Sequence, residues 1–292
     1  MWSRRFIGRG LAVTTLALTV GIALLAWRDK RAPVLHEVIV PVEGLSAEVR
    51  ILHASDLHSS SFGPSQKRLA ALLPAGERFD AAVLTGDLVV CDAEDDARRA
   101  LELAEIALSR ADVVFYTPGN HDGDALGTAL SALGVIDLTG APPATTIASG
   151  AGSVLVASPW TRDDHPGVDL LILASHYPFE PDTLAGFATS GRTTAVLAGH
   201  THGGQVRLPL IGALAAPGPI SWTEPDTRRP GHTDWLFPDL RGLHVEGLYE
   251  EAGVYQHVSG GLGTHAVPLR FGARSSMTVV RFVPADAAGA GL

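Results

Sequence analysis

Cysteine is almost absent from this chain, because Cys91 is the single cysteine among 292 residues. One cysteine cannot form an intrachain disulfide, and it excludes a zinc module built from several thiolates. Basic residues are also in the minority: 22 lysines and arginines stand against 31 acidic residues, and the net charge is −9. Proteins that bind nucleic acid need a basic face for phosphate contacts, so no nucleic-acid binding is expected.

Two common catalytic signatures are missing as well. The chain contains no Gly-x-Ser-x-Gly motif of the kind that presents a serine nucleophile, and it contains no phosphate-binding P-loop. No repeat of fixed period is visible. The composition is 46% apolar, which indicates a globular protein with a sizeable core. The protein is expected to be a monomer.

The N-terminus carries the one long apolar run of the chain. Residues 11–27 are uncharged, and arginine or lysine lies on both sides of them. This length is at the short limit for a membrane-spanning helix. The preceding run Ser3-Arg4-Arg5-Phe6-Ile7-Gly8 resembles a twin-arginine export signal. Residues 1–31 therefore predict a single-pass membrane anchor or a cleaved export signal, with a buried core helix as the third interpretation.

The rest of the chain has the pattern of one α/β domain. Residues 32–46 are expected to be a connector, residues 47–284 the domain, and residues 285–292 a flexible tail. Short apolar runs, partly β-branched, predict buried strands. They alternate with helix-like segments, of which 93–110 is the longest and is amphipathic. The predicted strands lie at 49–55, 81–85, 113–117, 153–157, 170–174, 194–198, 253–258 and 277–283.

Side chains that bind metals follow five of these strands. In open α/β sheets, ligand sites gather beyond the carboxyl ends of the strands, so these side chains are expected to meet at one rim. In chain order the segments are Asp56-Leu57-His58, Gly86-Asp87, Gly119-Asn120-His121-Asp122, Ser175-His176 and Gly199-His200-Thr201-His202.

The chemistry of these residues indicates a site for two metal ions. Nitrogen and oxygen ligands without thiolate suit Mn, Fe, Zn or Co. Two divalent ions about 3.5–4 Å apart need an anionic bridge, which an aspartate supplies. An isolated histidine after a strand is more often structural than functional. The specific signal is the complete order of motifs, each at the end of a strand.

This order resembles that of the calcineurin-like metallophosphoesterase superfamily, over residues 49–283. The run from Gly199 to Val206, with Gly261 to Thr264 and Pro268 to Phe271, resembles a bacterial branch that often has an N-terminal membrane or twin-arginine segment. The resemblance implies a four-layer α/β/β/α sandwich of two mixed sheets flanked by helices. The chain departs from the branch at Gly260, where arginine is common.

The resemblance also implies roles for individual residues. Asp87 would bridge the two ions, and a hydroxide that bridges both ions would attack phosphorus. His121 would face the scissile phosphate and either protonate the leaving oxygen or stabilise its charge, and Asp122 would orient His121 through a ring nitrogen. The first ion would be held by Asp56, His58 and His202, and the second by Asn120, His176 and His200.

The expected activity is hydrolysis of a phosphate ester, which is a diester, a monoester or a pyrophosphate. A membrane start suggests a phospholipid or a lipid-linked sugar phosphate, with the catalytic domain outside the cytoplasm. Trp222, Trp235 and Phe237 either line a substrate rim or pack onto the domain. Two other interpretations stay open: a nucleotide phosphodiesterase, and a metal-binding adaptor without activity. His265, after a Gly-rich turn, is a weak candidate to approach the site.

Overall fold

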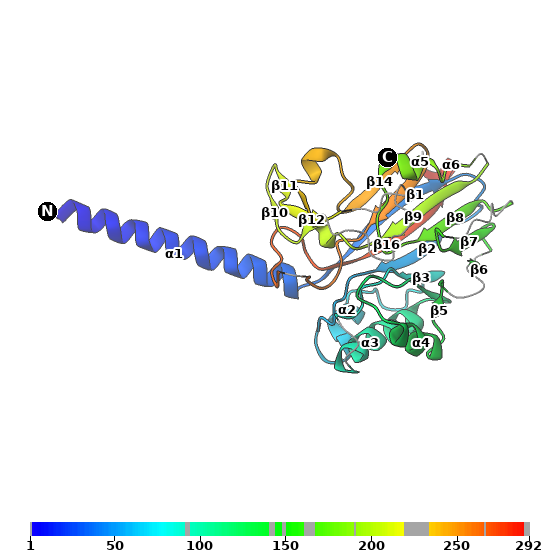
Figure 1. Cartoon of the computed structure of the whole chain (residues 1–292), viewed down its shortest axis with the longest axis horizontal. Helices are drawn as coiled ribbons and strands as arrows, with labels where there is room; N and C mark the ends of the chain where they lie inside the picture. Colours follow the sequence, from blue (N-terminus) through cyan, green and yellow to red (C-terminus); the bar gives the residue numbers. More distant parts are fainter. Residues whose placement is uncertain are drawn as a thin grey trace.

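Two six-stranded sheets form the body of the protein (Figure 1). The computed structural model describes residues 2–90, 94–139, 144–147, 150–160, 167–189, 191–218, 234–265 and 267–288. The first sheet has the order β1-β16-β2-β3-β4-β5, with bounds Val34–Val42, Ser276–Pro284, Val49–Ala54, Ala81–Leu84, Val114–Tyr116 and Ile136–Asp137. Strand β16 runs antiparallel to β2, while β2, β3, β4 and β5 are parallel, so the sheet is mixed.

The second sheet is mixed as well. Its order is β14-β15-β9-β8-β7-β6, with bounds Gly247–Glu251, Val254–Val258, Thr193–Ala198, Leu170–Ala174, Val154–Ala157 and Ala144–Ile147. The four central strands are parallel, and β14 and β6 are antiparallel edges. Two small hairpins follow β9, formed by β10 (Arg207–Leu208) with β11 (Gly212–Ala213) and by β12 (Ala215–Pro217) with β13 (Asp234–Leu236).

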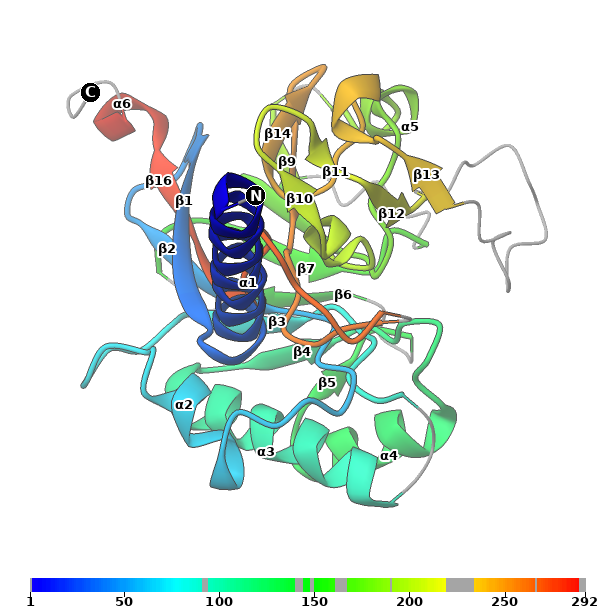
Figure 2. The ribbon, with the colours of Figure 1, turned by 90° about the vertical axis from the view of Figure 1, so that its left-hand side faces the viewer.

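Helices cover the outer faces of the sheets. Helices α2 (Lys67–Ala70), α3 (Glu94–Arg110) and α4 (Asp124–Ala132) lie against the first sheet, as Figures 1 and 2 show. The short α5 (Pro181–Ala185) packs its Leu184 on the outer face of the second sheet. Short 3-10 turns lie at Pro64–Gln66, His202–Gly204 and Asp239–Arg241. The predicted α/β class and layered sandwich are confirmed.

The alternation of side chains along a strand explains the layers. In β3, Ala82 and Leu84 belong to the core under the helices, whereas Ala81 and Val83 belong to the core between the two sheets. Both faces of the strand are therefore buried, which is why β3 is an uninterrupted apolar run.

The N-terminal helix α1 (Trp2–Arg31) extends away from the body and joins it at its last turn (Figure 1). There Asp29 accepts a hydrogen bond from the backbone N–H of Gly272 at 2.8 Å, and its carbonyl accepts one from Ser275 N–H at 2.9 Å. Among the residues that the structure describes, no helix has the length and apolar character needed to span a membrane.

The stretch expected to be a connector is largely part of the first sheet. Strand β1 pairs in parallel with β16 along its whole length, and its Val40 and Val42 are buried. The apolar alternation at the end of β1 supplies this core contact. At the other terminus, α6 (Ala285–Ala288) occupies the first half of the expected tail, and residues 289–292 lie outside the described residues.

Candidate active site

The two sheets bring all seven predicted metal ligands to one place. Asp87 takes part in two groups, in each of which the possible ligand atoms lie within 4.8 Å of one another. The first group is Asp56, His58, Asp87 and His202, and the second is Asp87, His176 and His200. Asn120 joins the second group, since its Oδ1 lies 3.2 Å from Nε2 of His176.

Distances within the groups show how the donors converge. Oδ2 of Asp87 lies 3.4 Å from Nε2 of His58 and 3.3 Å from Nε2 of His176. Nε2 of His58 lies 3.1 Å from Nε2 of His202, and Nδ1 of His200 lies 3.1 Å from Nε2 of His176. One carboxylate therefore stands between two sets of imidazoles, which is the position that a bridging ligand needs.

The donor set fits divalent transition metals. Apart from Asn120, these ligands are at most 5% exposed, so water does not compensate their charge. The ring nitrogen of His202 that faces the first group is Nε2, which lies 3.5 Å from Oδ1 of Asp56. Imidazole nitrogen, carboxylate and amide oxygen without thiolate are the ligands that Mn, Fe, Zn or Co accept.

Electrostatics couple the ligands to one another. Burial raises the pKa of Asp56 to about 6. For Asp87 burial also acts upward, but His176 and His58 outweigh it and hold the pKa of Asp87 below its usual range. Asp87 in turn outweighs the effect of burial on His176 and raises its pKa to about 9. Burial and the nearby His58 lower the pKa of His202, so this imidazole stays neutral and can act as a ligand.

The backbone of the site is unusual. Asp56, His58, Asp87, His200 and His202 have positive φ values between 41° and 72°. Non-glycine residues rarely adopt this region, and such strain gathers at functional sites.

Close backbone contacts hold these conformations. The backbone N–H of His200 donates to Oδ2 of Asp56 at 3.0 Å, and that of His121 donates to Oδ1 of Asp87 at 2.8 Å. Gly119 passes so near Asp87 that a Cβ at this position would clash with the carboxylate. The glycine of the Gly-Asn-His-Asp segment is therefore required by this crossing.

Asp122 accepts four hydrogen bonds from its surroundings. Its Oδ2 accepts hydrogen bonds from Tyr116 Oη at 2.9 Å and from Gly119 N–H at 3.0 Å. Its Oδ1 accepts from the N–H groups of Leu88 at 2.8 Å and Val89 at 3.2 Å. The carboxylate fills a gap between two strand-end loops whose N–H groups need acceptors. Asp122 thus shapes the loop that carries His121, while the orientation of the His121 ring by Asp122 stays a prediction.

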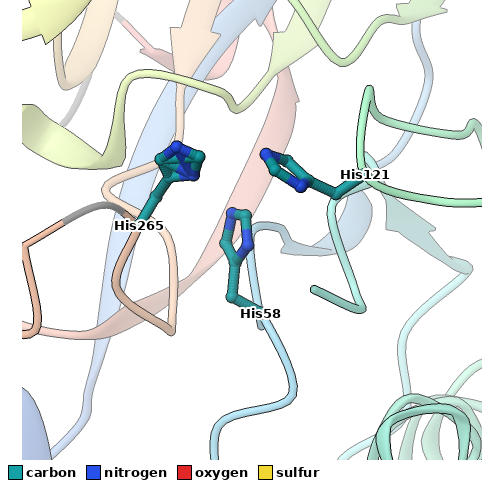
Figure 3. A group of neighbouring side chains, drawn as sticks. All are labelled: His58, His121 and His265. Carbon is teal, nitrogen blue, oxygen red and sulfur yellow. The ribbon is translucent and has the colours of Figure 1, made fainter. Parts of the chain in front are cut away.

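His265 lies much closer to the site than the sequence indicated. Its ring centroid is 4.7 Å from that of His121 and 5.4 Å from that of His58. Figure 3 shows the three rings pointing toward one another from separate segments. The motif order does not include His265, and only its place after a Gly-rich turn hinted at this position.

A cavity of about 410 Å³ opens over these residues. Its polar lining includes Asp87, His121 and His265. Its apolar lining is formed by Val206, Leu214, Ala215, Ala216, Pro217 and Val267.

Of the three aromatic residues considered as substrate contacts, only Phe237 has a described side chain. Trp222 lies outside the described residues, as does the side chain of Trp235, which belongs to β13. Phe237 is 43% exposed next to β13 and lies outside the described lining of the cavity.

Comparison with known proteins agrees with this arrangement. Residues 49–204 match the family model of the calcineurin-like phosphoesterases. An "uncharacterized metallophosphoesterase" of Helicobacter pylori (strain J99) is 26% identical over 274 residues, which cover 88% of this chain and 65% of that protein. The "uncharacterized metallophosphoesterase YkuE" of Bacillus subtilis (strain 168) is 27% identical over 256 residues, which cover 79% of this chain and 77% of that protein.

Among solved structures, the phosphopantetheinyl hydrolase PptH from Mycobacterium tuberculosis matches with a TM-score of 0.40 and 14% identity, covering 77% of this chain and 96% of that one. This similarity is too distant to support an argument. The chain spans less than two thirds of the Helicobacter relative, at 65% of its length. The match to the family model extends over more than half of the chain and includes all seven predicted ligands, so the chain belongs to the calcineurin-like phosphoesterase family.

Proposed function

We propose that this protein hydrolyses phosphate esters with two divalent metal ions. Asp56, His58 and His202 would hold the first ion, Asn120, His176 and His200 would hold the second, and Asp87 would be shared between them. The observation that supports this proposal best is the position of Asp87, whose Oδ2 lies within 3.4 Å of an imidazole nitrogen from each group. A single buried carboxylate shared in this way is what a two-metal site requires.

When bound, the ions supply a water of lowered pKa and offset the negative charge of the phosphoryl group. The residues around the ions determine the position of the substrate and the transfer of a proton to its leaving oxygen. The His121 ring lines the cavity, while its backbone N–H is tied to Oδ1 of Asp87. A general acid must stand within hydrogen-bond reach of the leaving oxygen, and a ring that lines the cavity can take that position. His121 therefore protonates the leaving oxygen, and Asp122 holds the loop on which His121 stands.

The cavity favours a substrate with an apolar substituent. Apolar residues, which include Val206, Leu214 and Val267, line the same cavity as His121. A phosphate ester with an acyl or alkyl group buries that group against these residues, and burial of apolar surface is favourable. A phospholipid or a lipid-linked sugar phosphate meets this requirement, whereas a free nucleotide leaves its polar groups facing apolar side chains.

Residues 1–31 are proposed to direct the catalytic domain out of the cytoplasm as a twin-arginine export signal. The paired Arg4 and Arg5 before the apolar run support this proposal. Cell fractionation tests it, because recovery of the full chain in the cytoplasmic fraction would contradict it.

The deciding experiment for the activity combines metal content with turnover. We expect about two transition-metal ions per chain by elemental analysis, and Mn²⁺-dependent hydrolysis of bis-p-nitrophenyl phosphate. Metal without turnover on this diester or on a monoester would favour the metal-binding adaptor. Faster hydrolysis of nucleotides than of phospholipids would favour the nucleotide phosphodiesterase. A chain that takes up no metal, even with added Mn²⁺, would contradict the proposal.

A further inference from the structure

The side-chain amide of Gln205 fixes the backbone of His265. Nε2 of Gln205 donates to the carbonyl of His265 at 2.7 Å, and Oε1 accepts from its N–H at 3.1 Å. Gln205 follows the Gly-His-Thr-His motif and itself has a positive φ of 45°. The segment that supplies two predicted ligands therefore also holds His265 in place.

A second set of contacts holds the turn before His265. The N–H of Gly263 donates to the carbonyl of Asp56 at 2.6 Å, and Nε of the buried Arg270 donates to the carbonyl of Gly263 at 2.8 Å. A Cβ on Gly263 would clash with the carbonyl of Leu57, so the turn packs tightly against the segment from Asp56 to His58. A side chain whose backbone is fixed on both sides needs less ordering when it binds a ligand.

The ring of His265 lies in the part of the cavity next to His121. His265 lines the cavity together with His121, and the two ring centroids are 4.7 Å apart. Figure 3 shows that they converge with His58, a member of the first ligand group, although His121 follows β4 and His265 follows β15. Two adjacent imidazoles can donate N–H groups to two oxygens of one phosphate, because hydrogen bonds of 2.7–3.2 Å are typical of such donors.

We propose that His265 is a second imidazole of the active site, which donates a hydrogen bond to a phosphoryl oxygen of the substrate. His121 serves the leaving oxygen, and His265 stabilises an oxygen that stays on phosphorus and gains charge in the transition state. The role in turnover rests on the proposed function, whereas binding of a phosphate group does not.

His265 is less suited to hold a third metal ion. His58, His121 and His265 do place ligand atoms within 4.8 Å of one another. However, His58 already belongs to the first group with Asp56 and Asp87, and the three histidines include no carboxylate to offset the charge of another cation. Metal content distinguishes this case from contact with substrate.

The test uses the full chain in four forms beside the wild type. His265→Ala and His265→Met both remove the donor, and methionine keeps the space filled if alanine prevents folding. His265→Gln retains an N–H donor. Leu269→Ala is the matched control, because Leu269 lies in the same segment, is 41% exposed and does not belong to the described lining of the cavity. The three readouts are metal content, kcat and KM for bis-p-nitrophenyl phosphate, and the affinity of the Mn²⁺-loaded protein for inorganic phosphate by calorimetry.

We expect His265→Ala and His265→Met to keep the metal content of the wild type and to weaken phosphate binding by about 10- to 100-fold, the range for a hydrogen bond to a charged group. The kcat/KM value should fall by at least as much, His265→Gln should recover part of both losses, and Leu269→Ala should resemble the wild type. Loss of metal in the His265 variants would make His265 a ligand and overturn the proposal, as would unchanged phosphate affinity. Absence of turnover in the wild type would count against the proposed function alone, since phosphate affinity still tests His265.

Discussion

Nδ1 of His53 lies 2.9 Å from Nδ1 of His257, and this contact joins β2 of the first sheet to β15 of the second. Nε2 of His53 lies 2.9 Å from the hydroxyl of Thr85. Both rings are buried, at 0% and 4% exposure. One Nδ1 must donate and the other accept, so at most one of the two rings can carry a charge while this contact is kept. Burial accordingly lowers the pKa of His257 to about 3 and that of His53 well below its usual range.

This histidine pair predicts loss of stability in acid. Because the folded-state pKa values are depressed, the unfolded chain binds more protons between about pH 3 and the ordinary histidine value of 6.5. The stability that the neutral histidine pair contributes is fully present above pH 6.5. It is lost progressively as the pH falls toward 3. In metal-free protein, His257→Gln should lower the slope of unfolding free energy against pH by about 1.4 kcal/mol per unit near pH 5. Urea unfolding at several pH values measures this, and equal slopes in both proteins would contradict it.

The general-acid role of His121 predicts loss of turnover without loss of metal. His121→Ala should retain the metal content of the wild type and lower kcat by roughly 10²–10⁴-fold on an ester with a poor leaving group. The loss should be smaller with p-nitrophenolate, which needs less protonation. Kinetics on the two esters measure the difference. The exposed His36 on β1 gives the control His36→Ala, and full activity of His121→Ala on the poor leaving group would exclude the role.

The shared position of Asp87 predicts that one substitution empties both halves of the site. Asp87→Asn keeps the size of the side chain but removes the negative charge that His58 and His176 face at 3.4 and 3.3 Å. Elemental analysis should find well below one metal ion per chain, and added Mn²⁺ should no longer raise the melting temperature. Asp182→Asn, on the exposed start of α5, should behave as the wild type. Retention of one full equivalent of metal would mean that Asp87 serves a single ion.

The hydrogen bonds of Asp122 predict that its substitution lowers both stability and activity. Asp122→Asn places an amide donor against the N–H groups of Gly119, Leu88 and Val89 and should cost about 1–3 kcal/mol of unfolding free energy. Tyr116→Phe removes one hydrogen bond to Asp122 and should cost only about 1 kcal/mol while activity stays near the wild-type value. Chemical unfolding and kcat measure both. If Asp122→Asn reduced kcat without any change in stability, direct contact with the His121 ring would again be favoured.

The sequence alone determined the eight predicted strands, the α/β class and the placement of the candidate metal ligands at strand ends. Strands such as β8 follow from apolar, β-branched runs, and helix α3 follows from its apolar spacing, since both patterns are local. The ligands were predictable for a related reason. Asp56, Asp87 and His176 each come within three residues of the end of a parallel strand, and such ends meet at one edge of the domain.

Tertiary structure alone decided the contacts between segments that no periodicity connects. Asp122 binds the loop after β3 because unpaired N–H groups happen to meet its carboxylate there. His265 reaches His121 because Gln205 and Gly263 hold its segment against the metal-binding loops. Strand β1 joins the sheet because β16, from the far end of the chain, offers it a free edge. A local pattern records what each residue prefers, whereas packing and hydrogen-bond satisfaction across the folded chain select its partner.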